Sequence, residues 1–586
     1  MVRNIFSVGG WTVVSRLTGF FRDMALAALL GGGALNDAYV AAIKLPNQFR
    51  QIFGEGSFNA AYLPTYTRVL ERKGHEAAGH FASQVFTLLI LSQVVLLGLV
   101  YLDMPLLVEL TSPGFVREPQ KFANAVAMSR IMFPYIAFIA LFALHQGTLN
   151  ANNSWSLPAA APAAANVCMI AFLGWAAFFP KVSPGVAAMA SWGFLASGAT
   201  QLALAMLDAR RRGLLERLAR PRWTPEVRQF FWMLGPAIGI SASYQIGALA
   251  DQIVGSLLPT GGLSAISYAD RLYQLPGGVI VIATGSVLLR EMAGLIARGD
   301  DEAALHAQNR AASLTVALGA PFVVVFLLIP DLLIAAAFEH GAFKATATHQ
   351  AAGVLAAYSI GMPALFVDRI VAASFLSRGD TATPMKVTLV GVALNVALKF
   401  LLYRPLGAPG LALATAAGLW VKVAGVYALA RRRGWSAPDD RFIGAAAATL
   451  FAAGALALAL TLADPALAFA LGPVRFAREI RLAILTMLGV AVYFPALAAG
   501  LGLTGAAPAG VVRRALRAAR KLLQRDAQPP GPEYDQCRDP VQRPGGGAVA
   551  RHRRRLGGLL YIRHQQFPFD LASRHGRLLP SLGNRS

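Results

Sequence analysis

Apolar segments long enough to cross a membrane recur along the chain from its N-terminus to about residue 503. A spanning helix needs about 20 mainly apolar residues, and the loops between these segments are too short to form a soluble domain. We therefore predict an all-α polytopic membrane protein with about 14 transmembrane helices. The spans are expected near residues 5–31, 36–66, 82–104, 123–150, 158–179, 185–207, 228–258, 264–292, 311–337, 350–377, 384–403, 408–430, 441–463 and 481–503.

The composition supports this fold class and narrows the chemistry. Hydrophobic residues make up 56% of the chain and charged residues 14%, whereas about 25% of the residues of a soluble protein are charged. The only cysteines, Cys168 and Cys537, are far apart and have no partners at disulfide or metal-ligand spacing. The sequence contains no HExxH, GxSxG or phosphate-binding-loop motif. We therefore expect no metal site, no catalytic residues and no enzymatic activity.

The polar loops alternate in charge. Cations gather after even-numbered predicted spans, as in residues 68–73, 210–222 and 431–433, and are scarce after odd-numbered ones except at 475–481. Loops rich in Lys and Arg stay in the cytoplasm, so we expect both termini there. An even number of spans independently places the two termini on the same side of the membrane. Membrane topology and the basic tail account for the net charge of +23, and nucleic acid is not an expected partner.

Two stretches of the chain resemble each other at a nearly constant distance. GHEAAGH at 74–80 matches DDEAALH at 300–306, and Pro134 matches Pro363, at offsets of 226 and 229 residues. The interval contains six predicted spans, so both copies enter the membrane in the same direction. This predicts two parallel-repeat six-helix lobes plus two C-terminal helices, with the substrate site between the lobes near mid-membrane.

Four regions follow from this repeat. We expect an N-lobe with its linker at 1–220, a C-lobe at 221–435 and two additional helices at 436–505. The remaining residues, 506–586, are rich in Arg, Pro, Gly and Gln and lack apolar periodicity. Such a composition is typical of disorder, so we predict a basic, disordered cytoplasmic tail.

Arginines within predicted spans are the strongest functional signal: Arg16, Arg22, Arg50 and Arg271. One charge near the middle of a spanning helix costs about 2.5–3.5 kcal/mol, so four facing lipid would cost on the order of 10 kcal/mol. They are therefore expected to face a wet cavity. Guanidinium groups bind phosphate oxygens in bidentate geometry, which makes a polyanionic ligand such as a pyrophosphate the leading candidate.

Carboxylates near these arginines qualify the prediction. Asp23 follows Arg16 by seven residues and lies on nearly the same helix face, and we interpret it as part of an ion pair that fixes packing. Arg50 can hold an anion or pair with Glu55, and the sequence leaves both alternatives open.

Further charges lie deeper in the spans. Lys44 can extend its ammonium to the membrane surface, as lysines usually do, or serve as a weaker ligand candidate. Asp270 directly precedes Arg271 in the second lobe, and Asp368 directly precedes Arg369 in the tenth span. We expect the 368–369 pair to neutralise itself.

With these motifs the chain resembles the MurJ (MviN) family of lipid II flippases, within the multidrug/oligosaccharidyl-lipid/polysaccharide exporter superfamily. The resemblance covers about residues 1–505. It rests on SRLTGFFRD at 15–23, NDAYVAAIKLPNQFRQIFGEGSF at 36–58, YADRLYQLPGGV at 268–279 and SRGDTATP at 377–384.

The resemblance implies a flippase that moves undecaprenyl-pyrophosphate-linked peptidoglycan precursor from the inner to the outer leaflet of the bacterial inner membrane by alternating access. It implies that the last two helices hold the lipid tail and that no cofactor is needed, with a coupling ion or the membrane potential driving or resetting the cycle. Membrane lipids and other cell-wall synthesis proteins are further expected partners of what we expect to be a monomer. The expected substrate-binding residues are Arg16, Arg22, Arg50, Arg271, Asp37 and Lys44, and the expected cavity ion pairs involve Asp23, Glu55 and Asp270.

Other functions predict other residues. An exporter of another polyprenyl-pyrophosphate-linked oligosaccharide would use the same cations and is the nearest alternative. A drug antiporter that moves cations would line its cavity with carboxylates and aromatic rings. An intramembrane lipid-processing enzyme would need a metal or nucleophile constellation, and a structural scaffold would leave the arginines unexplained.

Overall fold

The computed structural model describes residues 2–52, 58–472, 474 and 476–506. Every regular element in these ranges is helical, which confirms the predicted all-α fold class. Eight helical segments in the described ranges are long and apolar enough to span a membrane by length and composition. Glu55 and the predicted tail at 507–586 lie outside the described residues.

The first half of the chain is built of α-helices with one short 3-10 turn among the described residues. Its elements are α1 (Val2–Leu30), α2 (Ala34–Ile52), α3 (Phe58–Leu102), α4 (Met104–Thr111), the 3-10 turn η2 (Pro113–Arg117), α5 (Pro119–Met132), α6 (Tyr135–Ala151), α7 (Ser156–Ala176) and α8 (Pro184–Arg211). One hydrophobic core joins α1, α2 and α5 to α8, and a second joins α3, α6 and the start of the next helix, α9.

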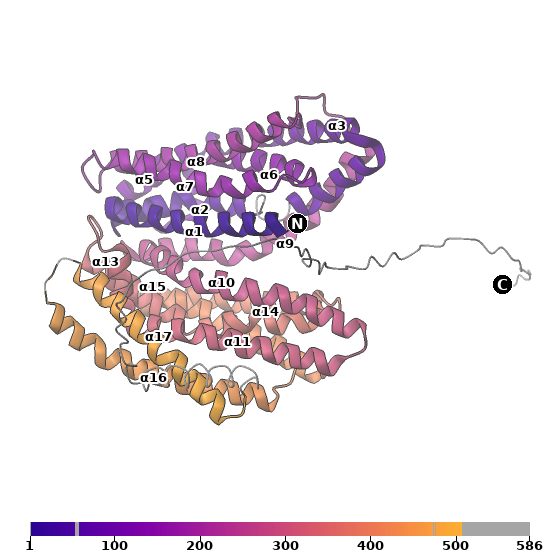
Figure 1. The fold of residues 1–586 in the computed structure, drawn as a ribbon. Coiled ribbons are helices and arrows are strands. Elements are labelled where there is room, and N and C mark those ends of the chain that lie inside the picture. Colours follow the sequence, from indigo (N-terminus) through magenta and orange to yellow (C-terminus); the bar gives the residue numbers. More distant parts are fainter. Residues whose placement is uncertain (1, 53–57, 473, 475, 507–586) are drawn as a thin grey trace, which may run out of the picture. The chain divides into compact units, whose positions relative to one another are not determined.

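The second half repeats this order of elements (Figure 1). It consists of α9 (Pro225–Ser256), α10 (Gly262–Ala297), α11 (Asp301–Leu328), α12 (Pro330–Phe338), α13 (Ala345–Ser359), α14 (Met362–Leu376) and α15 (Ala382–Arg432). The short helices α4 and α12 begin 226 residues apart, at Met104 and Pro330, as do α5 and α13. The repeat seen in the sequence is therefore also a repeat of helices.

Two long helices, α3 and α15, are each kinked at a glycine. Gly74 and Gly407 have φ values of 83° and 60°, which interrupt the helical backbone of α3 and α15. These left-handed values favour glycine, which has no Cβ to clash. α3 and α15 thus each contain two helical segments, and the predicted eleventh and twelfth spans are the two parts of α15.

The predicted second span at 36–66 takes in both α2, which is described to Ile52, and the first residues of α3, which is described from Phe58. Residues 53–57 lie outside the described part of the chain. α3 continues past the predicted end at 66, through Gly74 to Leu102, because hydropathy alone does not mark where a helix ends.

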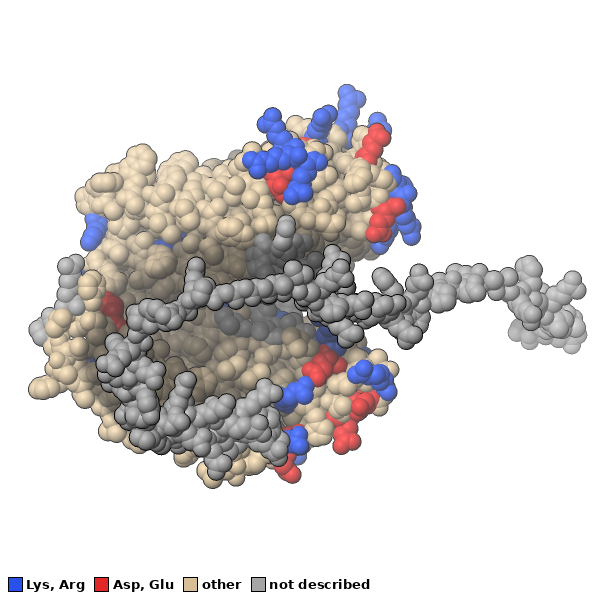
Figure 2. All heavy atoms as spheres, in the orientation of Figure 1, with Lys and Arg blue, Asp and Glu red and all other residues tan. Residues whose placement is uncertain are grey.

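The last two described helices, α16 (Asp440–Leu471) and α17 (Ala477–Leu503), pack against each other and against the second half, α16 on α11 and α17 on α12. Charged side chains gather at one end of the helices in Figure 2. Three ion pairs join residues at or near the ends and bends of helices: Lys73 to Glu226, Arg378 to Asp301 and Arg433 to Asp380. We call the end of the helices that these six residues mark the arginine-rich end.

Candidate functional site

A cavity of about 680 Å³ is lined by helices of both halves. α1, α2, α6, α7 and α8 contribute from the first half, and α10 and α14 contribute from the second. Its described lining includes one carboxylate, that of Asp23. Five arginines line it: Arg16, Arg22, Arg50, Arg271 and Arg369. The formal charge of these six side chains is strongly positive, as an anion-binding cavity requires.

Asp23 joins the two halves across this cavity. Its Oδ1 lies 2.8 Å from Nη2 of Arg22, and its Oδ2 lies 3.2 Å from Nε of Arg271. The carboxylate is 12% exposed. Asp23 thus forms the ion pair that was predicted for it, but with Arg22 and Arg271 and not with Arg16. Helical spacing identified the face of α1 and could not identify the partner from α10.

Asn166 on α7 orients Arg22 from the opposite side. Nη1 of Arg22 donates to Oδ1 of Asn166 over 2.8 Å, and Nδ2 of Asn166 donates to the carbonyl of Ser15 over 2.9 Å. An asparagine in an apolar helix indicates a polar partner within the membrane, although Asn166 is not among the predicted site residues. With Asp23 and Asn166 on either side, the Arg22 side chain is held in one position.

Arg16 extends toward α10. Its Nη1 lies 2.4 Å from the position that a Cβ on Gly278 would occupy. Only a residue without a side chain leaves room for the guanidinium at this point. Within the described part of the chain no ion pair involves Arg16, so its charge is directed into the cavity without a carboxylate partner.

Arg50 and its neighbours complete the set from α2. Nε of Arg50 donates to Oδ1 of Asn47 over 3.2 Å, and both residues line the cavity. The alternative pairing with Glu55 stays a prediction, because that residue is outside the described ranges.

Lys44 and Asp270 do not belong to the cavity lining. The ammonium of Lys44 and the carboxylate of Asp270 interact with each other electrostatically. Asp270 also accepts a hydrogen bond from Nε2 of Gln274 over 2.5 Å. Their predicted roles in ligand binding and in a cavity ion pair therefore remain predictions, and the structure places both residues outside the cavity wall.

Asp37 is a contact between the halves and not a lining residue. Its side chain is 1% exposed and accepts hydrogen bonds from the amides of Gly261 and Ser264 and from Oγ of Ser264, over 2.7, 2.8 and 2.6 Å. The Nζ of Lys121 lies 3.2 Å away. Asp37 thus supplies acceptors to the first amides of α10, which lack partners within their own helix. This contact is at the end opposite the arginine-rich end.

Arg369 is the cavity arginine that sequence reasoning missed. The expected neutralisation of Arg369 by Asp368 is wrong: Oδ2 of Asp368 lies 2.9 Å from Nζ of Lys422 on α15, and Arg369 lines the cavity. Adjacent residues on a helix point about 100° apart, so one faces α15 and the other the cavity. The unassigned intramembrane Lys422 was the signal for this arrangement.

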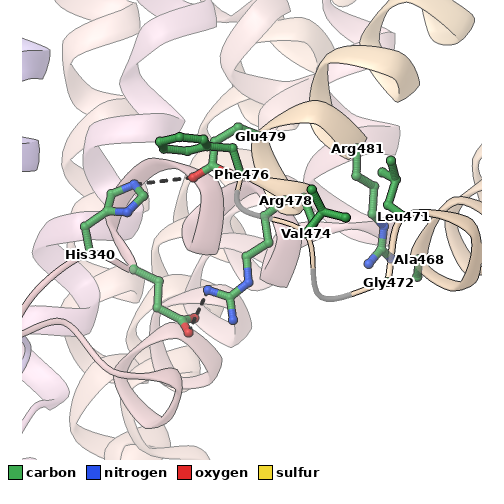
Figure 3. Close-up of a pocket in the computed structure, with 11 residues that line it drawn as sticks. His340, Ala468, Leu471, Gly472, Val474, Phe476, Arg478, Glu479 and Arg481 are labelled. Atoms are coloured by element: carbon green, nitrogen blue, oxygen red, sulfur yellow. Dashed lines mark ion pairs between the residues drawn. The ribbon is translucent and has the colours of Figure 1, made fainter.

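A second pocket, of about 540 Å³, lies where α17 begins, beside the end of α12 (Figure 3). Its charges neutralise one another. Arg478 pairs with Glu339 over 2.9 Å, Nε2 of His340 lies 3.8 Å from Glu479, and Arg481 pairs with Asp464. A balanced set of this kind fastens α17 to α12 and α16, and it lacks the excess positive charge of the central cavity.

Repeated helical halves around a charged cavity are typical of membrane transporters, and this fold and site place the chain in that class. Its family follows from the comparison with known proteins. The chain belongs to the lipid II flippase MurJ family, whose model matches residues 26–490. With its several apolar helices, it is a multi-pass protein of the bacterial inner membrane.

Individual relatives agree with this assignment. The chain is 35% identical over 523 residues to a probable lipid II flippase MurJ of Rhizobium meliloti (strain 1021), covering 88% of this chain and 96% of the relative. It is 29% identical to the lipid II flippase MurJ of Burkholderia cenocepacia over 76% of this chain and 86% of that protein.

Solved structures share the fold. A lipid II flippase MurJ in an inward closed conformation matches with a TM-score of 0.70 at 23% identity, covering 84% of this chain and 98% of that one. An inward-facing multidrug resistance transporter of the MATE family and MOP superfamily matches with a TM-score of 0.60 at 14% identity, covering 72% and 94%.

Proposed function

We propose that this protein moves lipid II from the inner to the outer leaflet by alternating access, with the pyrophosphate held by the arginines of the central cavity. The observation that carries the proposal is the set of five cavity arginines opposed by a single described carboxylate. Lipid II is the substrate that the family name implies. The pyrophosphate is its most highly charged group and matches the planar guanidinium donors.

The arrangement of the arginines supports this role. Arg16 and Arg22 come from α1, Arg271 from α10 and Arg369 from α14. A pyrophosphate bound among them would contact both halves. Because its binding would compete with Asp23 for Arg22 and Arg271, ligand entry would loosen the ion pairs that join the halves. Substrate binding and the ion pairs between the halves would thus depend on the same guanidinium groups.

The apolar part of the substrate would lie outside the cavity, on α16 and α17. Leu450, Leu458 and Leu462 on α16 and Met487 and Val490 on α17 have exposed side chains. Exposed apolar residues on a spanning helix are compatible with acyl or polyprenyl chains. We propose that these two helices guide the polyprenyl tail while the headgroup crosses through the cavity.

The orientation follows from charge. Cation-rich loops face the cytoplasm, so we propose that the arginine-rich end and both termini are cytoplasmic. An inside-negative potential then favours outward movement of an anionic headgroup by about 2.3 kcal/mol per charge per 100 mV. Membrane potential is therefore our proposed driving force, and a coupled ion is the alternative. Transfer that continues after the potential is collapsed would favour the coupled ion.

A reconstituted assay tests the function. Proteoliposomes with labelled lipid II are monitored for exposure of the label to an impermeant quencher, with single alanine variants of the five cavity arginines. We expect each variant to slow transfer by about tenfold or more, as loss of one charge-assisted hydrogen bond implies. Arg310→Ala is the matched control, because this arginine is 72% exposed at the arginine-rich end. Unchanged transfer in all five variants would overturn the proposal.

A further inference from the structure

The linker between the halves is fastened to the first half along its length. Residues 212–224 are not helical apart from the turn that ends α8. The amide of Arg217 donates to Oγ of Ser83 over 3.2 Å, and the amide of Ala219 donates to Oγ1 of Thr87 over 3.0 Å. Ser83 and Thr87 are one turn apart on α3. Hydroxyl groups on one face of α3 thus accept hydrogen bonds from linker amides that have no partner in a helix or strand.

Glu216 anchors this segment inside the first half. Its side chain is 1% exposed, whereas its neighbour Leu218 is 73% exposed. Oε1 accepts a hydrogen bond from Oγ1 of Thr148 over 2.7 Å, and Oε2 lies 2.6 Å from Nδ1 of the fully buried His145. A carboxylate is costly to bury unless it has such partners. Its place in a loop whose other residues are exposed or half-buried therefore indicates a specific attachment.

The attachment continues into the start of α9. Nζ of Lys73 lies 2.6 Å from Oε1 of Glu226. The ring of Phe230 packs edge-on against Phe58, Tyr62 and Phe81 of α3, with centroid distances of 5.5, 6.2 and 6.3 Å. The first turns of α9 therefore share a core with α3 and α6 of the first half, although α9 belongs to the second half by its place in the repeat.

We propose that Glu216 is a positioning residue for transport, which keeps the linker and the start of α9 attached to α3 and α6 throughout the cycle. Movement between the halves at the arginine-rich end then takes place beyond this stretch, within or after α9, and not in the linker. The inference rests on the proposed alternating access. Without the anchor, the linker would absorb the movement, and the second half would no longer turn as one unit against the first.

Disulfide trapping tests whether the linker stays on α3. In a background with Cys168→Ser and Cys537→Ser, Ser83→Cys is combined with Arg217→Cys, because the amide of Arg217 contacts the Ser83 side chain. We expect the disulfide to form readily and the oxidised protein to transfer lipid II at nearly the rate of the reduced protein. If oxidation abolishes transfer and reduction restores it, the linker must leave α3 during the cycle and the proposal fails.

Variants of Glu216 test its role. Glu216→Ala should slow transfer by about tenfold, from the loss of a charge-assisted contact, while lipid II binding to the detergent-solubilised protein is unchanged. Glu216→Gln, which can still bond Thr148, should retain most of the transfer, and Leu218→Ala serves as the exposed control. The decisive result is rescue: the Ser83→Cys/Arg217→Cys disulfide should restore transfer to Glu216→Ala, because the tether replaces the anchor.

The two proposals fail in different ways. Normal transfer by Glu216→Ala, or no rescue by the disulfide in a protein that binds lipid II normally, would overturn the role of Glu216 and leave the flippase function intact. If Glu216→Ala does not accumulate in membranes, the trapping experiment in the otherwise unchanged chain still decides whether the linker stays on α3 during the cycle. Absence of transfer by the unaltered protein would contradict the proposed function, whereas the disulfide yield reports on the linker alone.

Discussion

Asp23 and Arg271 are 248 positions apart in the chain and lie on different halves, yet Oδ2 of Asp23 is 3.2 Å from Nε of Arg271. The same carboxylate holds Arg22 through its other oxygen. A short ion-pair chain thus crosses the central cavity, and both of its cations are also candidate ligands for the substrate.

We expect Asp23→Asn to destabilise the protein, because it weakens two charge-assisted contacts at once. The loss should be on the order of 2 kcal/mol, measured as a lower thermal unfolding midpoint in detergent. The double variant Asp23→Asn/Arg271→Gln should be less destabilised than the sum of the single variants, because each change removes the other's partner. Strict additivity would show that the 3.2 Å contact contributes nothing.

Replacement of Asp37 should be more severe. Asp37→Ala leaves the ammonium of Lys121, itself 2% exposed, with Glu118 as its remaining ion-pair partner among the described residues. It also removes the two carboxylate oxygens that accept three hydrogen bonds from Gly261 and Ser264 at the start of α10. Breaking a buried pair costs about 3–5 kcal/mol, which should lower the unfolding midpoint strongly. Asp37→Ala/Lys121→Met should recover part of the loss. No recovery would mean that the hydrogen bonds to α10, and not the ion pair, account for the effect.

Gly278→Ala should reduce transport without unfolding the protein. The new Cβ would lie 2.4 Å from Nη1 of Arg16, and this long side chain can move aside at little cost. We expect weaker lipid II binding and slower transfer at an unchanged unfolding midpoint. Gly294→Ala, in the same helix but with no heavy atom within 4 Å of the added Cβ, is the control. Equal effects of the two substitutions would indicate helix propensity and not displacement of Arg16.

Asp380 should make the arginine-rich end sensitive to acid. Hydrogen bonds from the amide and hydroxyl of Thr383, followed by the contact with Arg433, lower the pKa of Asp380 to about 2. Because its folded pKa is below the unfolded value of 3.8, Asp380 contributes stability that is complete above about pH 4 and is lost as the pH falls toward 2. Asp380→Asn should remove this part of the pH dependence, measured by thermal unfolding from pH 6 to pH 3. If the unfolding midpoint of Asp380→Asn falls with pH as steeply as that of the unaltered protein, this assignment is contradicted.

The helices were largely predictable, because long apolar runs bounded by charge are the clearest signal in a membrane sequence. The predicted span at 264–292, for example, lies within α10 (Gly262–Ala297). The predicted span at 36–66 was less accurate, because it joins residues of α2 to the first residues of α3. Apolar periodicity does not assign residues to one helix or to the next when both helices are apolar.

The cavity was only partly predictable. Arg16, Arg22, Arg50 and Arg271 do line it, since an intramembrane charge must avoid lipid wherever the fold places it. The partners of these charges were not accessible to the same reasoning. Asp23 pairs across the halves with Arg271, and Asp368 turns to Lys422 on α15 and leaves Arg369 in the cavity. Contacts between distant helices depend on how the halves dock, which the spacing within one helix does not encode.

The cap that Asp37 places on α10 determines how this end of the protein can come apart. Separation would expose a carboxylate, an ammonium and the first amides of a helix, all of which water can hydrate as soon as they part. An apolar seal would instead resist wetting over its whole area. A closure made of polar groups exchanges one set of hydrogen bonds for another, so it can open and reseal many times with only a small difference in free energy between the two states.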